Sequence, residues 1–407
     1  MLLGRVRSGF RSQLAVASGE LRAVMLGAVL IMAGFGLIVP ALPLFAKRFG
    51  VGDAGVSLLI TSFAAMRLVG NFLVGRALTR HGERAVTVWG ALIVGLSSLA
   101  AAAAVNYPML LIFRTLGGIG SAFYFGGLLS YLLARVPPHQ RGRATALFQG
   151  AVSAGIFVGP VVGGLLIAWR GENFPFAVYG VACLLAAGWS YRTMSKPIHQ
   201  HATGVKPPNL QVLAGLMKDR SYRISLLVAM MGFVVLMAPQ VLLPTLWVDT
   251  LDLSKATIGI PFTVTTGAGL LVILHAGHLV DQRGRKGVIV GSAFALAAGL
   301  AGLSRVGGFW TVCGAMFVIG AATGYSRPAV TSVLGDVATE ENRGVAIGGF
   351  RVAQDLGGLI GPAIAGPVSQ AFGPRVGFLV IAVVALLVAL STLRLRETAP
   401  HLAPRTS

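Results

Sequence analysis

The chain consists mostly of apolar runs of the length that a lipid bilayer requires of a helix. A bilayer-spanning helix needs about 20 mainly apolar residues, and twelve such runs occupy most of the 407 residues. They cover approximately residues 22–46, 54–78, 85–105, 108–134, 143–169, 174–192, 223–247, 255–280, 287–305, 308–335, 344–370 and 375–394. No sizeable soluble domain fits between them. The sequence therefore predicts an all-α integral membrane protein with twelve transmembrane helices.

The composition excludes a soluble or disordered protein. Charged residues make up only 11% of the chain and apolar residues 55%, whereas soluble domains carry about 25% charged residues and disordered chains are poor in apolar ones. Cys183 and Cys313 lie inside apolar runs, so neither a disulfide framework nor a metal site is expected. The sequence contains no Gly-x-x-x-x-Gly-Lys-Ser/Thr loop for nucleotide phosphates and no catalytic constellation. We expect a protein that is not an enzyme and that needs no cofactor.

The distribution of cations predicts the topology. An even number of spans places both termini on one side of the membrane, and 23 of the 33 Lys and Arg residues lie in segments on that side, against 6 on the other. The positive-inside rule assigns the richer side to the cytoplasm. The net charge of +20 therefore reflects topology, and we expect no nucleic-acid partner. We expect a multi-pass protein of the bacterial cytoplasmic (inner) membrane, surrounded by lipid, with both termini in the cytoplasm.

The two halves of the chain share landmark residues at one fixed offset of 202 positions. The matching landmarks are Gly75 and Gly277, Gly82 and Gly284, Arg141-Gly142 and Arg343-Gly344, Phe148 and Phe350, and Gly159-Pro160 and Gly361-Pro362. Parallel repeats related by an axis along the membrane normal are a design of secondary transporters. The sequence thus predicts an N-terminal six-helix bundle at 1–192, a cytoplasmic linker at 193–221 and a C-terminal six-helix bundle at 222–407.

The loop after the eighth run combines glycines, an acid and cations, in the order Gly277, Asp281, Gly284, Arg285 and Lys286. Glycine permits a tight turn between two helices. The carboxylate of Asp281 is suited to accept hydrogen bonds from the N-terminus of a neighbouring helix. The spacing Gly-x-x-x-Asp-x-x-Gly-Arg-Lys resembles the loop signature of the major facilitator superfamily.

The matching loop after the second run departs from this signature. It contains Gly75, Thr79, Arg80 and Gly82, but Thr79 stands in the place of the acid and Glu83 in the place of a cation. The resemblance implies that this first copy links the two halves in the outward-facing state. We hypothesise that the link is weaker here and that the inward-facing state is more populated.

Two further motifs resemble those of the same family. The fourth run contains Arg114, Gly118 and Gly120 in the pattern Arg-x-x-x-Gly-x-Gly, whose counterpart in the family is associated with proton transfer. The fifth run resembles the antiporter motif that is associated with exporters, through Gly155, Gly159, Pro160, Gly163 and Gly164, with a weaker copy at Gly361 and Pro362. Proline bends a helix and glycines allow close helix packing. The resemblance covers about residues 20–395 and is closest to the 12-span drug:proton antiporters.

Asp355 is the one carboxylate that lies deep in an apolar run, and Arg351 precedes it by one helical turn. Intramembrane ionisable groups are functional candidates by default. Burial raises the pKa of a carboxyl group and a nearby arginine lowers it, so changing proximity to Arg351 would let Asp355 take up and release a proton. We predict Asp355 as the proton-coupling group, with Arg351 and Arg114 as its modulators. A static salt bridge between Asp355 and Arg351 is the alternative.

The candidate substrate contacts are polar or aromatic residues inside the runs. They are Arg67, Asn71, Phe35, Tyr124, Gln149, Gln240, Tyr325 and Arg327. The deep charges are mainly arginines, and guanidinium groups bind carboxylates and phosphates well. An anionic or zwitterionic substrate is therefore an open alternative, and ordinary packing is the alternative for the aromatic side chains.

These features favour a monomeric secondary transporter that exports small amphipathic molecules such as drugs or metabolites, driven by proton influx through alternating access. The first alternative is an importer or uniporter of a small organic anion. The second is a membrane sensor or membrane enzyme, which would need an appended soluble domain or a polar catalytic cluster that the sequence does not contain.

Overall fold

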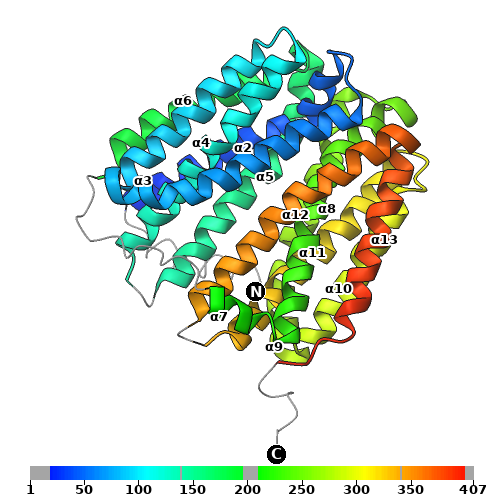
Figure 1. The fold of residues 1–407 in the computed structure, drawn as a ribbon. Helices are drawn as coiled ribbons and strands as arrows, with labels where there is room; N and C mark the ends of the chain where they lie inside the picture. The colour runs from blue at the N-terminus through cyan, green and yellow to red at the C-terminus, as the bar shows by residue number, and fades with distance from the viewer. Residues whose placement is uncertain (1–18, 138–139, 196–209, 340–341, 399–407) are drawn as a thin grey trace, which may run out of the picture. The chain divides into compact units, whose positions relative to one another are not determined.

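The computed structural model describes residues 19–137, 140–195, 210–339 and 342–398, and this part of the chain contains helices and no strand (Figure 1). The helices group into two compact units. Residues 196–209 of the predicted linker lie outside the described residues, and its described end contains the short helix α7 (Leu210–Leu216).

Unit 1 contains residues 1–41 and 65–204. Its described helices are α2 (Gly19–Lys47) as far as Ala41, α3 (Asp53–Ala102) from Ala65 onward, α4 (Tyr107–Arg135), α5 (Arg141–Arg170) and α6 (Phe174–Thr193).

Unit 2 contains residues 42–64 and 205–407. It thus combines the end of α2 and the start of α3 with helices of the second sequence half. These are α7, α8 (Arg220–Pro244), the π-helix η2 (Thr245–Thr250), the short 3-10 helix η3 (Lys255–Thr257), α9 (Gly259–Arg283), α10 (Arg285–Leu303), α11 (Phe309–Val337), α12 (Arg343–Phe372) and α13 (Pro374–Thr392).

All twelve predicted apolar runs fall on helices of the described part. Among the described residues, ten helices are long and apolar enough to cross a membrane. One of them, α3, carries two of the predicted runs, because two helical segments meet at a kink at Gly82. The run at 344–370 forms α12, which is not among these ten helices.

The glycines at the two predicted loops adopt the conformation that only glycine adopts without strain. Gly82 has a φ of 77° and Gly284 a φ of 84°, and side chains with a Cβ atom are disfavoured there. The two residues are 202 positions apart, so equivalent positions of the sequence repeat share the same backbone conformation. The prediction of a tight glycine turn after the second and eighth runs is confirmed at these positions.

Within unit 1, the glycines of the fifth run bring α5 into backbone contact with α2. A Cβ atom on Gly159 would lie 2.5 Å from the carbonyl oxygen of Ala33, and one on Gly163 would lie 2.5 Å from that of Leu37. Gly155 faces the carbonyl oxygen of Val29 in the same way, at 2.6 Å. Close approach of two helices at small residues is how membrane helices gain packing contacts in lipid.

Unit 2 repeats this arrangement with α12 against α8. A Cβ atom on Gly361 would lie 3.0 Å from Cα of Val234, and Gly357 faces the backbone of Met230. Gly357 and Gly361 are the counterparts of Gly155 and Gly159 at the offset of 202. Each half of the sequence therefore places its glycine-rich helix on its own first helix.

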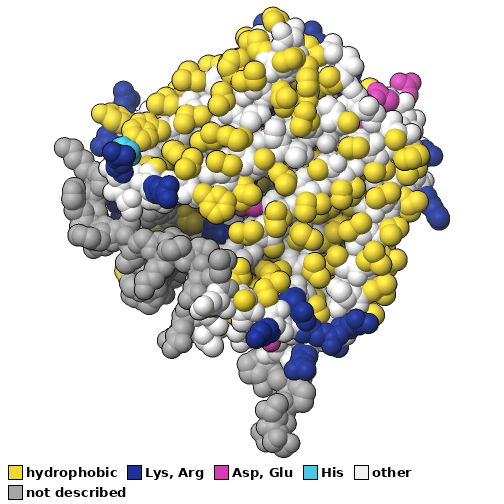
Figure 2. All heavy atoms as spheres, in the orientation of Figure 1, with side chains coloured by type: hydrophobic (Ala, Val, Ile, Leu, Met, Phe, Trp, Pro, Cys, Tyr) yellow, Lys and Arg dark blue, Asp and Glu magenta, His cyan; other side chains and the backbone are white. Residues whose placement is uncertain are grey.

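The outer faces of the helices are apolar. Hydrophobic side chains spread over the visible face in Figure 2, and Lys and Arg side chains gather toward the helix ends. Large apolar side chains such as Leu271 and Leu387 are more than half exposed. An exposed apolar surface of this extent marks a membrane-facing region rather than a water-facing one.

Candidate functional site: a cavity lined by Arg327 and the other predicted polar residues

Arg327 lines a cavity in unit 2 that is bordered by α8, α10, α11, α12 and α13. The cavity has a volume of about 50 Å³, which accommodates a small substituent and not a whole drug-sized molecule. Its polar lining residues are Ser292, Thr323, Ser326, Arg327 and Gln354, and its apolar ones include Met231, Phe233 and Phe350. The Arg327 side chain is also exposed, so it can meet a molecule that enters from outside the unit. One guanidinium group and several neutral polar groups therefore face an otherwise apolar space.

The predicted site residue Gln240 makes its contacts within its own helix. It is 8% exposed, and its Nε2 donates a hydrogen bond of 3.4 Å to the carbonyl oxygen of Leu236. Tyr325 is half-buried, and its ring lies edge-on to His275 with 5.9 Å between the centroids. Tyr325 and Arg327 are two residues apart on α11, and Arg327 alone of these lines the cavity described above.

Arg114 and Phe35 are brought together within unit 1. Arg114 is 7% exposed, and its Cζ lies 5.7 Å from the centroid of the Phe35 ring. Cation–π contact of this kind lowers the cost of keeping a guanidinium in apolar surroundings. Gly120 lies two residues after Gly118 on the same helix and faces the backbone of Gly90 and Val94 on α3. The Arg-x-x-x-Gly-x-Gly motif thus contains one buried cation and one point of tight helix contact.

Other predicted contacts in unit 1 differ in burial. Tyr124 is fully buried, with its ring edge-on to Phe125 at 5.2 Å, which is the environment of a packing residue. Arg67 is half-buried on α3, whereas Asn71 and Gln149 are exposed.

Asp355, predicted as the proton-coupling group, and Arg351, predicted as its modulator, both lie on α12 of unit 2. Asp355 is half-buried and Arg351 is exposed. Asp355 is therefore less enclosed than its position inside an apolar run suggested, because a helix has a face that points away from the protein core.

The loop after the eighth run, residues 277–286, is the second motif loop. Two acidic residues that the sequence analysis did not select, Asp336 and Glu397, bind its cationic end. The guanidinium of Arg285 faces the carboxylate of Asp336 on α11, with 2.9 Å between Nε and Oδ2 and 3.4 Å between Nη2 and Oδ1. The backbone N–H groups of Arg285 and Lys286 donate to the two carboxylate oxygens of Glu397, at 2.9 and 3.1 Å. Glu397 therefore caps the N-terminus of α10, where unpaired N–H groups attract a negative charge. The side chain of Asp281, for which the sequence predicts a capping role, lies outside the described residues.

The loop after the second run, residues 75–84, is the first motif loop, and its contacts are of a different kind. Thr79 donates from Oγ1 to the carbonyl oxygen of Arg76, 2.9 Å away in its own helix. Arg84 donates to the carbonyl oxygen of Tyr191 at 2.5 Å and lies over the Tyr191 ring. Arg80 is exposed. This loop is therefore fastened to the end of α6 by a cation and contains no carboxylate at position 79.

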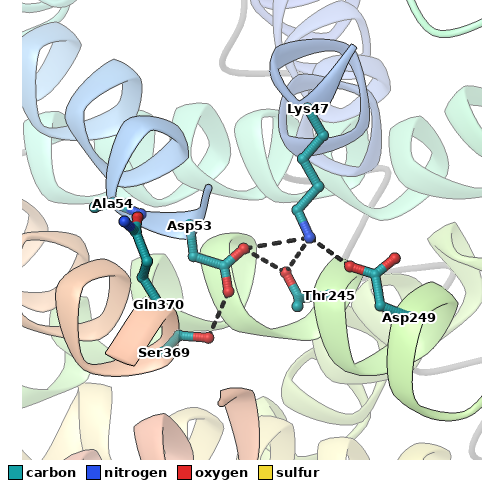
Figure 3. A network of polar contacts seen from close by, with 7 residues as sticks. All are labelled: Lys47, Asp53, Ala54, Thr245, Asp249, Ser369 and Gln370. Atoms are coloured by element: carbon teal, nitrogen blue, oxygen red, sulfur yellow. Dashed lines mark hydrogen bonds and ion pairs between the residues drawn. The ribbon is translucent and has the colours of Figure 1, made fainter. Parts of the chain in front are cut away.

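A polar network in unit 2 joins the segment 42–64 to η2 and α12 (Figure 3). Asp53, the first residue of α3, accepts hydrogen bonds from Thr245 Oγ1 at 2.7 Å and from Ser369 Oγ at 2.5 Å. Lys47 Nζ lies 3.3 Å from Asp53 Oδ1 and 2.6 Å from Asp249 Oδ2. Asp53 is the only acidic residue of the described part that is buried, at 5% exposure.

This network was not predicted from the sequence. The candidate residues were charges inside apolar runs, whereas Lys47 and Asp53 lie on either side of a loop between two runs. A signal was nevertheless present. The repeat offset of 202 relates Lys47 to Asp249 and Asp53 to Lys255, so the two halves carry opposite charges at equivalent positions. Opposite charges at equivalent positions of two repeats are candidates for pairing with one another.

The comparison with known protein families agrees with this architecture. The family model described as Major Facilitator Superfamily matches residues 24–254 and 224–407. The chain belongs to the major facilitator superfamily and is a membrane transporter rather than an enzyme. The prediction made from the loop signatures is thereby confirmed.

Individual relatives cover most of the chain. It is 24% identical to the quinolone resistance protein NorA of Staphylococcus aureus over 83% of this chain and 86% of that protein. It is 26% identical to multidrug resistance protein 2 of Bacillus subtilis over 82% of this chain and 84% of that protein. An uncharacterized MFS-type transporter of Methanocaldococcus jannaschii is 25% identical over 84% of this chain and 89% of its own length.

Solved structures share the fold. The nucleoside transporter NupG superposes with a TM-score of 0.76 at 14% identity, covering 93% of this chain and 99% of that one. The D-xylose-proton symporter has a TM-score of 0.72 at 17% identity, covering 94% of this chain and 99% of that one. At these identities the likeness establishes the fold alone.

Proposed function

We propose that this transporter exports small amphipathic molecules in exchange for protons, by alternating access of two six-helix bundles in the bacterial inner membrane. The observation that carries the proposal is the backbone contact between α5 and α2 at Gly155, Gly159 and Gly163. These glycines belong to the motif that resembles the antiporter motif of exporters. Relatives named for quinolone and multidrug resistance support the same direction of transport.

In this proposal Asp355 takes up the coupling proton, and Arg351 and Arg114 modulate it. The exchange needs no cofactor, because the proton gradient is the driving force. The positive-inside distribution of Lys and Arg supports a cytoplasmic location for both termini, and the transporter works as a monomer.

Proton flux in proteoliposomes tests the proposal. Purified protein is reconstituted with an inward-directed proton gradient, and a pH-sensitive dye reports proton movement when cationic, neutral or anionic amphiphiles are added. We expect substrate-evoked proton movement in the native protein and none in Asp355→Asn. The matched control is Asp252→Asn, which removes an exposed acid from a loop. Substrate transport without proton movement, with Asp355→Asn fully active, contradicts proton-coupled export.

A second candidate, an importer or uniporter of a small organic anion, is favoured by one observation. The cavity in unit 2 is lined by Arg327 and by no acidic side chain among its described residues. A guanidinium group beside an apolar space is suited to a carboxylate or phosphate. The anionic arm of the same experiment separates the two candidates, because this one predicts anion movement without substrate-evoked proton exchange.

A further inference from the structure

The segment 42–64 belongs by sequence to the first repeat, but it packs into unit 2 with helices of the second repeat. It consists of the end of α2, a short loop and the start of α3. Both of its helices continue into unit 1, since α2 enters the segment at Leu42 and α3 leaves it at Ala64. The segment is therefore the part of unit 2 to which both α2 and α3 connect unit 1.

The carboxylate of Asp53 fastens the segment to two different elements of unit 2. Oδ1 accepts from Thr245 of η2 at 2.7 Å, and Oδ2 accepts from Ser369 of α12 at 2.5 Å (Figure 3). Both bonds are charge-assisted, which makes them stronger than bonds between neutral groups. Lys47 completes the arrangement, because its Nζ lies 3.3 Å from Asp53 Oδ1 and donates to Thr245 Oγ1 at 2.9 Å.

The backbone around Asp53 is fitted to α12 as closely as the side chain is. Gln370 accepts a hydrogen bond of 3.0 Å from the N–H of Ala54, so a side chain of α12 satisfies the first turn of α3. A Cβ atom on Gly52 would lie 2.8 Å from Gln370 Oε1. A Cβ atom on Gly366 would lie 2.7 Å from the carbonyl oxygen of Asp53. Glycine at position 366 lets the two backbones approach, and glycine at position 52 leaves room for the Gln370 side chain.

We propose that Asp53 is a positioning residue of the transport cycle. Its ionised carboxylate holds the segment 42–64 on η2 and α12 in one state, and the segment separates from them when the protein opens at this end. The end concerned is the one opposite the chain termini in the predicted topology. The proposal rests on membership of a transporter family, and it requires neither the direction of transport nor proton coupling.

The charge state of position 53 decides how firmly the segment is held. An uncharged amide in the place of the carboxylate loses the attraction to Lys47. Its nitrogen also cannot accept the hydrogen bond from a hydroxyl group that one carboxylate oxygen accepts now. Loss of charge-assisted hydrogen bonds to a buried carboxylate disfavours the state that contains them. Asp53→Asn therefore shifts the protein toward the state in which the segment is released.

Cysteine labelling from outside the cell measures this shift. Ser57, 4% exposed on α3, faces Gly366 of α12, so Ser57→Cys becomes accessible when the segment separates from α12. Cys183 and Cys313 are replaced by alanine to remove the background. Right-side-out vesicles are then treated with a membrane-impermeant maleimide. We expect slow labelling with Asp53 present and labelling about tenfold faster in Asp53→Asn, which corresponds to the lower end of what a hydrogen bond to a charged group contributes.

Matched variants separate a role in the cycle from general damage. Asp53→Glu keeps the charge and should restore part of the slow labelling. Asp252→Asn removes an exposed acid near the same end of the molecule and should leave the rate unchanged. Ser369→Ala removes one hydrogen bond without leaving a buried charge unpaired, so it keeps the test decisive if Asp53→Asn does not fold. It should raise the rate in the same direction by a smaller factor.

Transport kinetics provide a second readout. A purely structural role of Asp53 would not change kcat selectively over KM. We expect Asp53→Asn to change kcat with little change in KM, because Asp53 does not line the cavity that contains Arg327. Labelling at the native rate in folded Asp53→Asn, or an equal increase in Asp252→Asn, overturns the proposal. The labelling needs neither substrate nor a proton gradient. A result against proton-coupled export therefore leaves the role of Asp53 standing, and a result against the role of Asp53 leaves proton-coupled export standing.

Discussion

Lys47 and Asp249 occupy equivalent positions of the two sequence repeats, 202 residues apart, and their side chains form an ion pair with 2.6 Å between Nζ and Oδ2. The repeat that preserves the glycines of both halves reverses the charge here, since Asp53 in turn corresponds to Lys255. A cation from the first repeat and an acid from the second are therefore complementary at this end of unit 2.

The two acids that contact Lys47 should differ in their effect on stability. Asp249 is 52% exposed at its side chain and Asp53 only 6%. Solvent-exposed ion pairs contribute at most about 1 kcal/mol, so Asp249→Asn should lower the free energy of unfolding by less than that. Asp53→Asn leaves the buried hydroxyl of Ser369 and the half-buried hydroxyl of Thr245 without a charged acceptor and should cost roughly 2–3 kcal/mol. Thermal unfolding in detergent measures both, and equal effects would contradict the difference in burial.

Gly159→Ala should impair the packing of α5 on α2. The new methyl group would lie 2.5 Å from the carbonyl oxygen of Ala33, and forced overpacking costs about 1–3 kcal/mol. Gly150→Ala is the matched control in the same helix, because no described atom beyond its own stretch of helix lies within 4 Å of its Cβ position. We expect loss of both thermal stability and transport for Gly159→Ala alone. Equal behaviour of the two variants would show that the close contact does not matter.

Glu397→Gln should weaken the start of α10. The carboxylate accepts hydrogen bonds from the N–H groups of Arg285 and Lys286, and loss of a helix N-cap costs about 0.5–2 kcal/mol. Glutamine keeps one acceptor oxygen but loses the charge, so we expect a fall in the lower part of that range. Arg396→Gln changes an exposed neighbour and serves as the control in thermal unfolding. A larger fall for Arg396→Gln would contradict the capping role.

Arg327→Gln should change which substrates are carried. If the cavity holds an anionic substituent, the variant should raise KM for anionic substrates about tenfold, while KM for neutral ones stays near native, because a hydrogen-bonded contact to a charge is lost. Arg327→Lys should recover part of the affinity. Uptake and efflux assays with matched acids and methyl esters measure this difference. Arg305→Gln, an exposed loop arginine, is the control, and equal loss for acids and esters would exclude a charge contact.

Thr79→Asp restores the acid that the family signature has in the first motif loop. Thr79 now bonds only to the carbonyl oxygen of Arg76 among the described contacts. A carboxylate there would attract cations and helix N-termini, so we expect a smaller inward-facing population. Distances between spin labels on the cytoplasmic ends of the two halves measure the populations. Unchanged distance distributions would remove the hypothesis that Thr79 weakens this link.

Much of the fold was predictable, because local chemistry determines it. Apolar runs must form helices in lipid, since every backbone polar group has to be bonded within the segment. The turns at Gly82 and Gly284 and the packing glycines on α5 and α12 follow from a residue that lacks a Cβ atom. These features depend on neighbours in sequence or on contact between repeated helices, so the repeat and the motifs were sufficient to identify them.

The candidate site was predictable only in part. Depth in an apolar run pointed to Arg114, which is buried, and to Arg327, which lines the cavity, whereas the role of the half-buried Asp355 stays a prediction. Capping of α10 by Glu397 joins residues more than 100 positions apart. Hydrogen-bond partners at such separations depend on how the helices pack and leave no local pattern.

The amino-acid sequence by itself determined the membrane class, the family, the internal repeat and the glycine contacts within each half. Only the tertiary structure decided that Asp53, a residue at the edge of a loop, is the buried carboxylate of the described part. Its partners Thr245 and Ser369 lie 192 and 316 positions away. The physical reason is that burial of a charge is a property of the elements packed around it. For Asp53 those elements are η2 and α12, which the second half of the chain supplies.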